Sequence, residues 1–312
     1  RPPAAAAGAI FGGRAAAWRR QAAPSRGFAT AAFTVPAKGQ APEQTLFVVG
    51  LNEGKFFGQD GAEEGLKLLE RVAEHHKEYE LLFGLHEKEL AWMEADHKVK
   101  NNRLTPSRDL ETARRCEMVP LIQAGMVDHI PRRAMGRPLT TTQSHVAWML
   151  WKHPREAVQL YWAYWRRKDY KDAAARARWS KVFPTAANAY WDERAEIISI
   201  RAVEHLTGAI SRGRGGAFVL VVGNDLFGLV TQGLGDLLEG EAAGRLGTPA
   251  FSQQLHERAS HLLAEVPDLT PVLIFFYAGL PLLVGHFAFL GFQYYAGKKR
   301  MWDKVFEAER RD

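Results

Sequence analysis

Cysteine is nearly absent from the chain, which has one, Cys116, in 312 residues. A single cysteine cannot form a disulfide within the chain or supply the several thiolates of a Cys-based zinc site. This scarcity excludes the small disulfide-stabilised domains and the thiolate zinc modules. The H-E-x-x-H pattern of helical zinc proteases is also missing. We interpret Cys116 as an ordinary thiol, and we expect no bound cofactor and no metal.

Acidic residues are missing from the first 42 residues, which carry six lysine and arginine side chains. Those six account for the whole formal net charge of +6, because residues 43–312 hold 35 basic and 35 acidic side chains. A nucleic-acid-binding domain would carry a basic patch on its folded part. We therefore expect no nucleic-acid partner.

Residues 1–42 have the composition of a mitochondrial transit peptide, rich in alanine and arginine and free of acid. A matrix peptidase that cuts after Phe28 would leave Ala29 as the first residue, and Arg26 lies three residues before it. We predict that this leader directs the chain to mitochondria. We also predict that residues 1–28 are removed from the mature chain or ordered only by a partner.

Asp, Glu, Lys and Arg are all missing from the apolar segment 270–297. The segment is longer than the roughly 20 residues that one helix needs to cross a bilayer. Two tyrosines near its end match the aromatic belt of a membrane interface, and the tail 298–312 begins with three cations. We predict one transmembrane helix over 269–297, kinked near Pro281. The alternative is a buried core helix.

Small and polar residues within this segment predict contacts with other membrane subunits. Gly279, Gly285 and Gly291 offer small faces for close helix packing. His286 is the only histidine within segment 270–297. A polar side chain at membrane depth usually faces protein rather than lipid. The orientation stays open, because the basic tail favours the matrix side whereas a simple stop-transfer after a matrix leader would favour the opposite.

Two short apolar runs predict buried strands. Thr45–Val49 ends at Gly50, and Ala217–Val222 ends at Gly223, followed by a loop at Asn224. Continuous apolar runs of this kind are typical of strands covered on both faces in a parallel sheet. Apolar residues at helical spacing predict helices over 61–94 and 191–212. The predicted fold is α/β, with a mixed or parallel sheet covered by helices.

Weaker patterns mark the remaining segments. The aromatic-rich stretch 145–190 predicts a long helical insertion whose rings form a core layer or contact a membrane or partner. Residues 131–138 form a basic loop, interpreted as surface, with a phosphate or lipid-headgroup contact as the alternative. Residues 236–268 predict one amphipathic helical linker. Four histidines are interpreted as part of a solvated face: His75, His76, His86 and His97.

The stretch 191–230 resembles the C-terminal half of the TraB (pheromone-shutdown) domains, which are related to the Tiki metalloproteases. Glu193-Arg194 matches the helix start of that family, Val221-Val222-Gly223 matches its strand, and Leu229 matches the residues beyond. The resemblance implies a TraB-like domain over 43–235. It also implies that the loops after the two predicted strands meet at one edge of the sheet.

The histidines of the TraB pattern are replaced in this chain. Each motif loop of the family reads G-x-x-His, and the slots after Gly50 and Gly223 here hold Glu53 and Leu226. In the Tiki-like relatives those histidines and an acidic residue hold a metal ion that activates water. The resemblance therefore implies a degenerate site without catalytic residues.

Three functions remain open at this point. We expect a catalytically inactive TraB-like domain that serves as an accessory or structural subunit of a mitochondrial inner-membrane complex, of the respiratory-chain or ATP-synthase type. Its partners would be other membrane subunits and membrane lipid. One alternative is a membrane-anchored metal-dependent hydrolase that uses Glu53 and Asp225 as oxygen ligands. The other is a lipid- or small-molecule-binding membrane protein.

Overall fold

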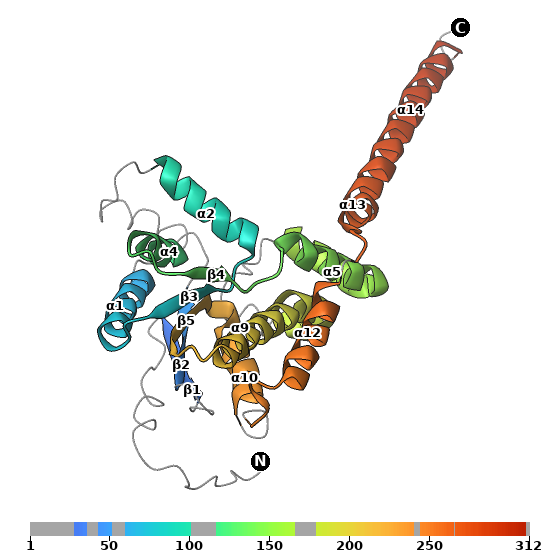
Figure 1. The fold of residues 1–312 in the computed structure, drawn as a ribbon. Coiled ribbons are helices and arrows are strands. Elements are labelled where there is room, and N and C mark those ends of the chain that lie inside the picture. The colour runs from blue at the N-terminus through green and yellow to red at the C-terminus, as the bar shows by residue number, and fades with distance from the viewer. Residues whose placement is uncertain are drawn as a thin grey trace, which may run out of the picture.

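A five-stranded mixed sheet lies at the centre of the folded part, in the order β1-β2-β5-β3-β4 (Figure 1). The computed structural model describes residues 28–35, 43–51, 60–100, 117–165, 179–239, 244–264 and 266–309. The strands are β1 (Ala29–Val35), β2 (Gln44–Leu51), β3 (Tyr79–Phe83), β4 (Arg132–Ala134) and β5 (Gly216–Gly223). β1 runs antiparallel to β2, and the other four strands are parallel to one another.

The two strands expected from the sequence are neighbours in this sheet. β2 and β5 pair in parallel, with Thr45 opposite Ala217 and Leu51 opposite Gly223. Both strands therefore end at the same edge, with Gly50 and Gly223 one step apart in register. The α/β class and the parallel pairing of these two runs are confirmed.

Helices cover both faces of the sheet. α1 (Asp60–His75), α2 (Glu87–Lys100) and α4 (Met118–Val127) belong to one face, and α9 (Glu193–Ser211), α10 (Asn224–Leu238) and α12 (Pro249–Leu263) belong to the other (Figure 1). Successive side chains of a strand point to opposite faces, so Val219 packs with the first set and Leu220 with the second. Both β5 residues are fully buried, which explains why the run is apolar at every position.

Several local predictions are wrong. Residues 79–83 form strand β3 rather than a continuation of the predicted helix 61–94, because α1 already ends at His75. Asn224 and Asp225 belong to the first turn of α10 rather than to a loop. The predicted linker 236–268 is not one helix, since α10 ends at Leu238 and α12 begins at Pro249.

Two further differences concern segments that the sequence assigned elsewhere. β1 lies inside the predicted leader 1–42 and pairs with β2 along its whole length, so the sheet begins before residue 43. The predicted basic surface loop 131–138 contains β4, and Arg137 within it is buried. Both segments are short and carry polar or small residues, which hides their place in the sheet from pattern reading.

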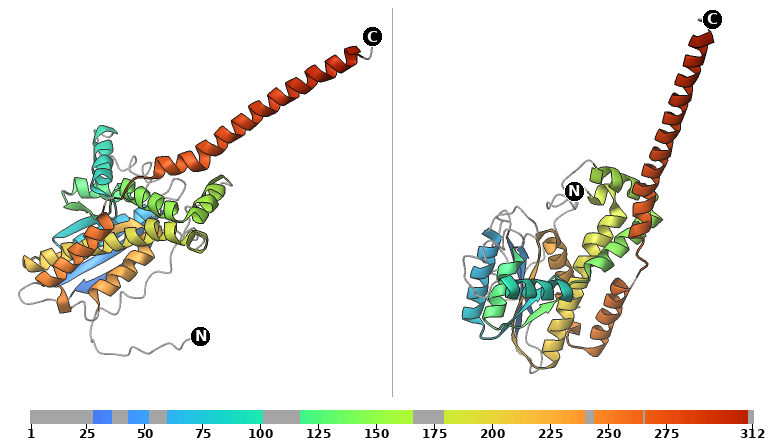
Figure 2. Two further views of the ribbon diagram at one scale, coloured as in Figure 1. Left: turned by 90° about the vertical axis from the view of Figure 1, so that its right-hand side faces the viewer. Right: turned by 90° about the horizontal axis from the view of Figure 1, so that it is seen from above.

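A long C-terminal helix projects away from the domain (Figure 2). It begins with α13 (Thr270–Ile274), passes through the π-helical turn η3 (Phe275–Gly279) and continues as α14 (Leu280–Glu309). The departure from α-helical geometry falls directly before Pro281. Proline cannot donate a helical hydrogen bond, and its ring clashes with the carbonyl four residues earlier, so the preceding turn is where the bonding pattern must change.

Helices from the aromatic-rich segment receive the root of this long helix. They are α5 (Leu139–Lys152), α6 (Pro154–Trp165), α8 (Pro184–Ala187) and the π-helical turn η2 (Asn188–Asp192), which runs directly into α9. Leu273 and Tyr277 of the C-terminal helix pack against a small buried cluster formed by Leu150, Ala157, Phe183 and Ala186. The predicted helical character of 145–190 is thus found in the described part of that segment.

Candidate functional site

The edge where β2 and β5 end is closely packed rather than open. A Cβ atom added at Gly50 would lie 2.7 Å from Asn224 Oδ1 and 3.0 Å from Phe227 Cβ. Real Cβ atoms do not approach neighbours so closely, so glycine at this position lets the first turn of α10 lie against the end of β2. The first turn of α10 therefore packs directly against the end of β2.

The motif residues at this edge face protein rather than a ligand. Leu226 is fully buried in the core between the sheet and α9. Asp225 accepts a hydrogen bond of 3.0 Å from the indole Nε1 of buried Trp191. Glu53 lies outside the described residues. Gly223 is the N-cap of α10, in an extended conformation that any residue adopts.

These residues do not fit the metal ion that the resemblance implies for its active relatives. Leu226 has no donor atom, and one oxygen of Asp225 already accepts a hydrogen bond from Trp191. Over the described ranges, no three His, Cys, Asp or Glu side chains lie close enough together to hold a metal ion. The aspartate acts instead as the polar partner of an indole that would otherwise be buried without one.

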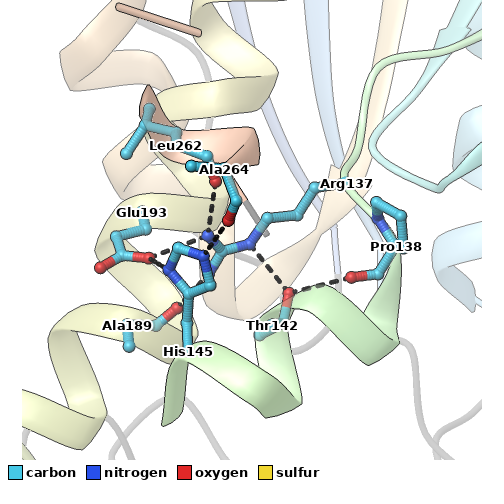
Figure 3. A network of polar contacts seen from close by, with 8 residues as sticks. All are labelled: Arg137, Pro138, Thr142, His145, Ala189, Glu193, Leu262 and Ala264. Carbon is cyan, nitrogen blue, oxygen red and sulfur yellow. Dashed lines mark hydrogen bonds and ion pairs between the residues drawn. The ribbon is translucent and has the colours of Figure 1, made fainter. Parts of the chain in front are cut away.

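A second polar cluster lies about Arg137, and sequence reasoning did not find it. We define the Arg137 network as the side chains of Arg137, Thr142, His145 and Glu193 (Figure 3). They come from the loop after β4, from α5 and from the first turn of α9. No local pattern joins them, because residues 137–145 and 193 are far apart in the chain and meet only in the fold.

Arg137 is the centre of this network, and its side chain has no solvent exposure. Its Nη1 donates to Glu193 Oε2 at 2.8 Å, and its Nε donates to Thr142 Oγ1 at 3.0 Å. Its Nη2 donates to the carbonyl of Ala189 in η2 at 2.6 Å. Burial lowers the pKa of Arg137, and the hydrogen bond that its guanidinium donates to Glu193 opposes that effect. The carboxylate therefore compensates the buried cation.

His145 connects the same carboxylate to the end of α12. Its Nδ1 lies 3.0 Å from Glu193 Oε2, and its Nε2 lies 3.0 Å from the carbonyl of Ala264. His145 therefore places one ring nitrogen beside each of two acceptor oxygens and joins α5 to α9 and to the end of α12.

The Arg137 network fixes the segment that leads into the C-terminal helix. Arg137 Nη1 also donates to the carbonyl of Leu262 at 3.2 Å, beside the His145 contact to Ala264. These carbonyls belong to the last turn of α12 and the residue after it, and α13 starts six residues beyond Ala264. The network thus contacts the backbone of this segment at two carbonyls and holds its geometry.

A third polar group, made by His205, Glu80 and Arg133, joins α9 to two strands. His205 Nε2 lies 2.8 Å from Glu80 Oε2, and Arg133 Nε lies 3.4 Å from the same oxygen. Burial lowers the pKa of His205, and the smaller opposing effect comes from its hydrogen bond to the carboxylate of Glu80. The group ties α9 to the sheet, and it lies outside the motif edge.

Three of the four histidines interpreted as a solvated face have described side chains, and each makes a separate contact. His75 is exposed and contacts the carbonyl of Arg71 in its own helix, and His86 Nδ1 accepts from the backbone of Lys88. His76 contacts the ring of Phe47. The side chain of His97 lies outside the described residues.

The aromatic residues of the helical insertion divide between core and surface. Trp191 is buried and packs edge to face with Trp179 and Tyr190. Trp151 is exposed, and its ring lies 6.0 Å from that of Phe276 at the root of the C-terminal helix. The core interpretation therefore holds for Trp191, whereas Trp151 lies at the surface of the domain.

Comparison with known proteins finds no matching family model, no similar curated protein and no similar solved structure.

Proposed function

We propose that this chain is a non-catalytic, TraB-like domain anchored by one transmembrane helix, which serves as an accessory subunit of a mitochondrial inner-membrane complex. The observation that carries the proposal is the exposed C-terminal helix. Pro271–Arg300 is the one span within the described residues that is long and apolar enough to cross a membrane.

The exposure of this span argues against the alternative of a core helix. A core helix would be mostly covered by the domain, and no residue in the most apolar window of this span is buried. Large apolar side chains all round α14 face outward, among them Leu283, Phe287 and Phe292. Leaving so much apolar surface in water is costly, and a bilayer removes it.

The motif edge supports a non-catalytic role. The histidine slot after β5 holds a core leucine, and the neighbouring aspartate is bonded to Trp191. We expect the purified full chain to contain no stoichiometric transition metal by elemental analysis. One metal ion for each chain would contradict this part of the proposal and favour the hydrolase alternative.

The order of strands supports the TraB resemblance, and the start of β1 supports the mitochondrial leader. Parallel pairing of β2 with β5 brings both motif loops to one edge, as the resemblance requires. The strand β1 begins at Ala29, directly after the predicted cleavage at Phe28, so removal of the leader would leave the sheet whole.

Alkaline carbonate extraction of membranes tests the anchor. We expect the full chain to stay in the membrane pellet, because its anchor is inserted rather than adsorbed. The test variant combines Leu283→Arg, Phe287→Arg and Leu290→Arg. Each arginine near the bilayer centre raises the free energy of membrane insertion by about 2.5–3.5 kcal/mol, so this variant is expected in the supernatant.

The matched control replaces the same three residues by alanine. All three side chains are exposed, so neither variant removes a contact within the domain. Alanine keeps the span apolar, and the control is expected to stay in the pellet. Extraction of the unchanged chain by carbonate would contradict the anchor.

A further inference from the structure

An exposed surface of mixed aromatic and basic character lies at the corner between α5 and α6. We define the α5–α6 surface as Trp151, Lys152, Arg155 and Val158, with Lys181 and Val182 from the segment before α8. All six side chains are exposed. Trp151 and Val158 keep 47% and 43% of their surface in solvent, although both are large and apolar.

This surface adjoins the root of the C-terminal helix. The opposite sides of α5 and α6 form the buried cluster on which Leu273 and Tyr277 pack. Trp151 contacts Phe276 in η3, and Val182 directly precedes Phe183 of the cluster. In both views of Figure 2 the long helix leaves the domain beside these green helices. The surface is thus continuous with the start of the membrane span.

The charges on the surface have one sign. Lys152, Arg155 and Lys181 are exposed cations, and α5 contains no acidic residue. The nearby carboxylate of Glu156 is held by Thr185, whose hydroxyl and backbone N–H donate to its Oε2 at 2.7 and 3.2 Å. Lys152 Nζ lies 4.8 Å from the ring centre of Trp148, which keeps the cation beside an aromatic face.

This combination fits the headgroup region of a bilayer better than open water. Tryptophan is favoured there because its ring has an apolar body and a polar N–H, and lysine and arginine attract anionic headgroups. We infer that the α5–α6 surface lies on the bilayer that α14 crosses and binds anionic phospholipid. The inference rests on the proposed anchor and adds a second, peripheral contact that fixes the tilt of the domain.

Fluorescent labelling of the full chain in lipid nanodiscs tests this contact. Cys116→Ser supplies a background without thiols, and Val158→Cys carries an environment-sensitive fluorophore at the surface. The nanodiscs contain equal parts of phosphatidylcholine and phosphatidylglycerol. We expect quenching by a nitroxide on the lipid headgroup and loss of quenching by aqueous iodide.

Val127→Cys is the matched control, a valine of 48% exposure at the end of α4. α4 packs with α1 and α2 on the opposite face of the sheet, so its label should respond to iodide and not to the headgroup nitroxide. A charge reversal, Lys152→Glu with Arg155→Glu, should abolish headgroup quenching at Val158. The reversal Lys67→Glu at an exposed position of α1 should leave that quenching unchanged.

A third label separates failure of this inference from failure of the proposed anchor. Phe289→Cys lies within α14, and its label should be quenched by a nitroxide on the acyl chain. If Phe289 is quenched in this way while Val158 behaves like Val127, the lipid contact is refuted and the anchor stands. If the Phe289 label is open to iodide, both are refuted. Protection of Val158 in native membranes but not in nanodiscs would overturn the inference in favour of a protein partner.

Discussion

Arg137 couples three parts of the chain through one buried guanidinium. Its nitrogens contact Glu193 of α9, Thr142 of α5 and the carbonyls of Ala189 in η2 and Leu262 in α12. Burying a charge without a partner is expensive. The pairing with Glu193 therefore decides whether this part of the domain is stable.

Arg137→Met is expected to destabilise the domain strongly. It leaves the buried carboxylate of Glu193 without its main partner, a loss of about 3–5 kcal/mol in the free energy of unfolding. Urea unfolding of the detergent-solubilised chain, followed by tryptophan fluorescence, measures it. Arg133→Met is the control, because Arg133 is 56% exposed and meets Glu80 at 3.4 Å, which is worth about 0–1 kcal/mol. Equal losses for the two variants would contradict this account.

His205 is expected to make stability depend on pH. Burial lowers its pKa from the ordinary value of 6.5, so the unfolded chain takes up a proton before the folded chain does. Its contribution to stability is complete above about pH 6.5 and is lost as pH falls toward the folded pKa. The pKa of Glu204 is raised by burial and acts with the opposite sign, so the comparison needs a variant that retains it.

His205→Gln isolates this effect, because glutamine can still donate to Glu80 and cannot titrate. Between about pH 7.5 and about pH 5.5, roughly one unit either side of the free histidine pKa, the unchanged chain should lose more stability than the variant. Thermal unfolding at the two pH values measures the difference. Equal losses would show that His205 and Glu80 do not set this dependence.

The contact between β2 and α10 depends on a glycine. Gly50→Ala would place a Cβ 2.7 Å from Asn224 Oδ1, and the resulting strain should cost about 1–3 kcal/mol of stability. Gly228→Ala within α10 is the control, because no atom lies within 4 Å of its added Cβ. That change should be neutral or stabilise the helix by up to about 1 kcal/mol. A Gly50→Ala variant as stable as the original would refute the close packing of the motif edge.

Elements with a strong local signal could be predicted from the sequence, and elements defined by distant contacts could not. β5 is apolar throughout because both faces are covered, so its pattern identified it as a strand and placed it parallel to β2. β3 has only five residues and comes soon after α1, and its apolar spacing is also compatible with a helix. The sequence therefore did not show where the helix ends and the strand begins. β1 combines alanine and threonine within an acid-free segment that resembles a leader.

The candidate sites divide in the same way. The place of Leu226 just after the end of β5 could be predicted from the sequence, because the apolar run before it is continuous. The Arg137 network could not, since Arg137, His145 and Glu193 carry no common spacing and depend on packing of η2, α5 and α12. The basic segment 131–138 was predicted to be a surface loop. The sequence alone does not show whether an arginine has a buried partner, and that partner is what distinguishes a buried arginine from an exposed one.

At the scale of the whole molecule, the domain and the C-terminal helix differ in how they meet their surroundings. The domain buries its apolar residues against a covered sheet, whereas α14 exposes them along the apolar part of its length. Gly285 and Gly291 of α14 have no atom within 4 Å of an added Cβ, so both faces are open for packing against another chain. Being six residues apart at about 100° per residue, they point roughly 120° away from each other and present two faces.

Blue-native electrophoresis of mildly solubilised mitochondrial membranes, probed for this chain, tests the central claim most directly. The account predicts a band at a mass several times the 34.9 kDa of the chain, because the chain assembles with other membrane subunits. The variant Gly285→Leu with Gly291→Leu should insert normally but should no longer migrate in that band. Leucine blocks close helix packing without touching the domain. Migration of the unchanged chain alone, at its own mass with bound detergent, would contradict the account.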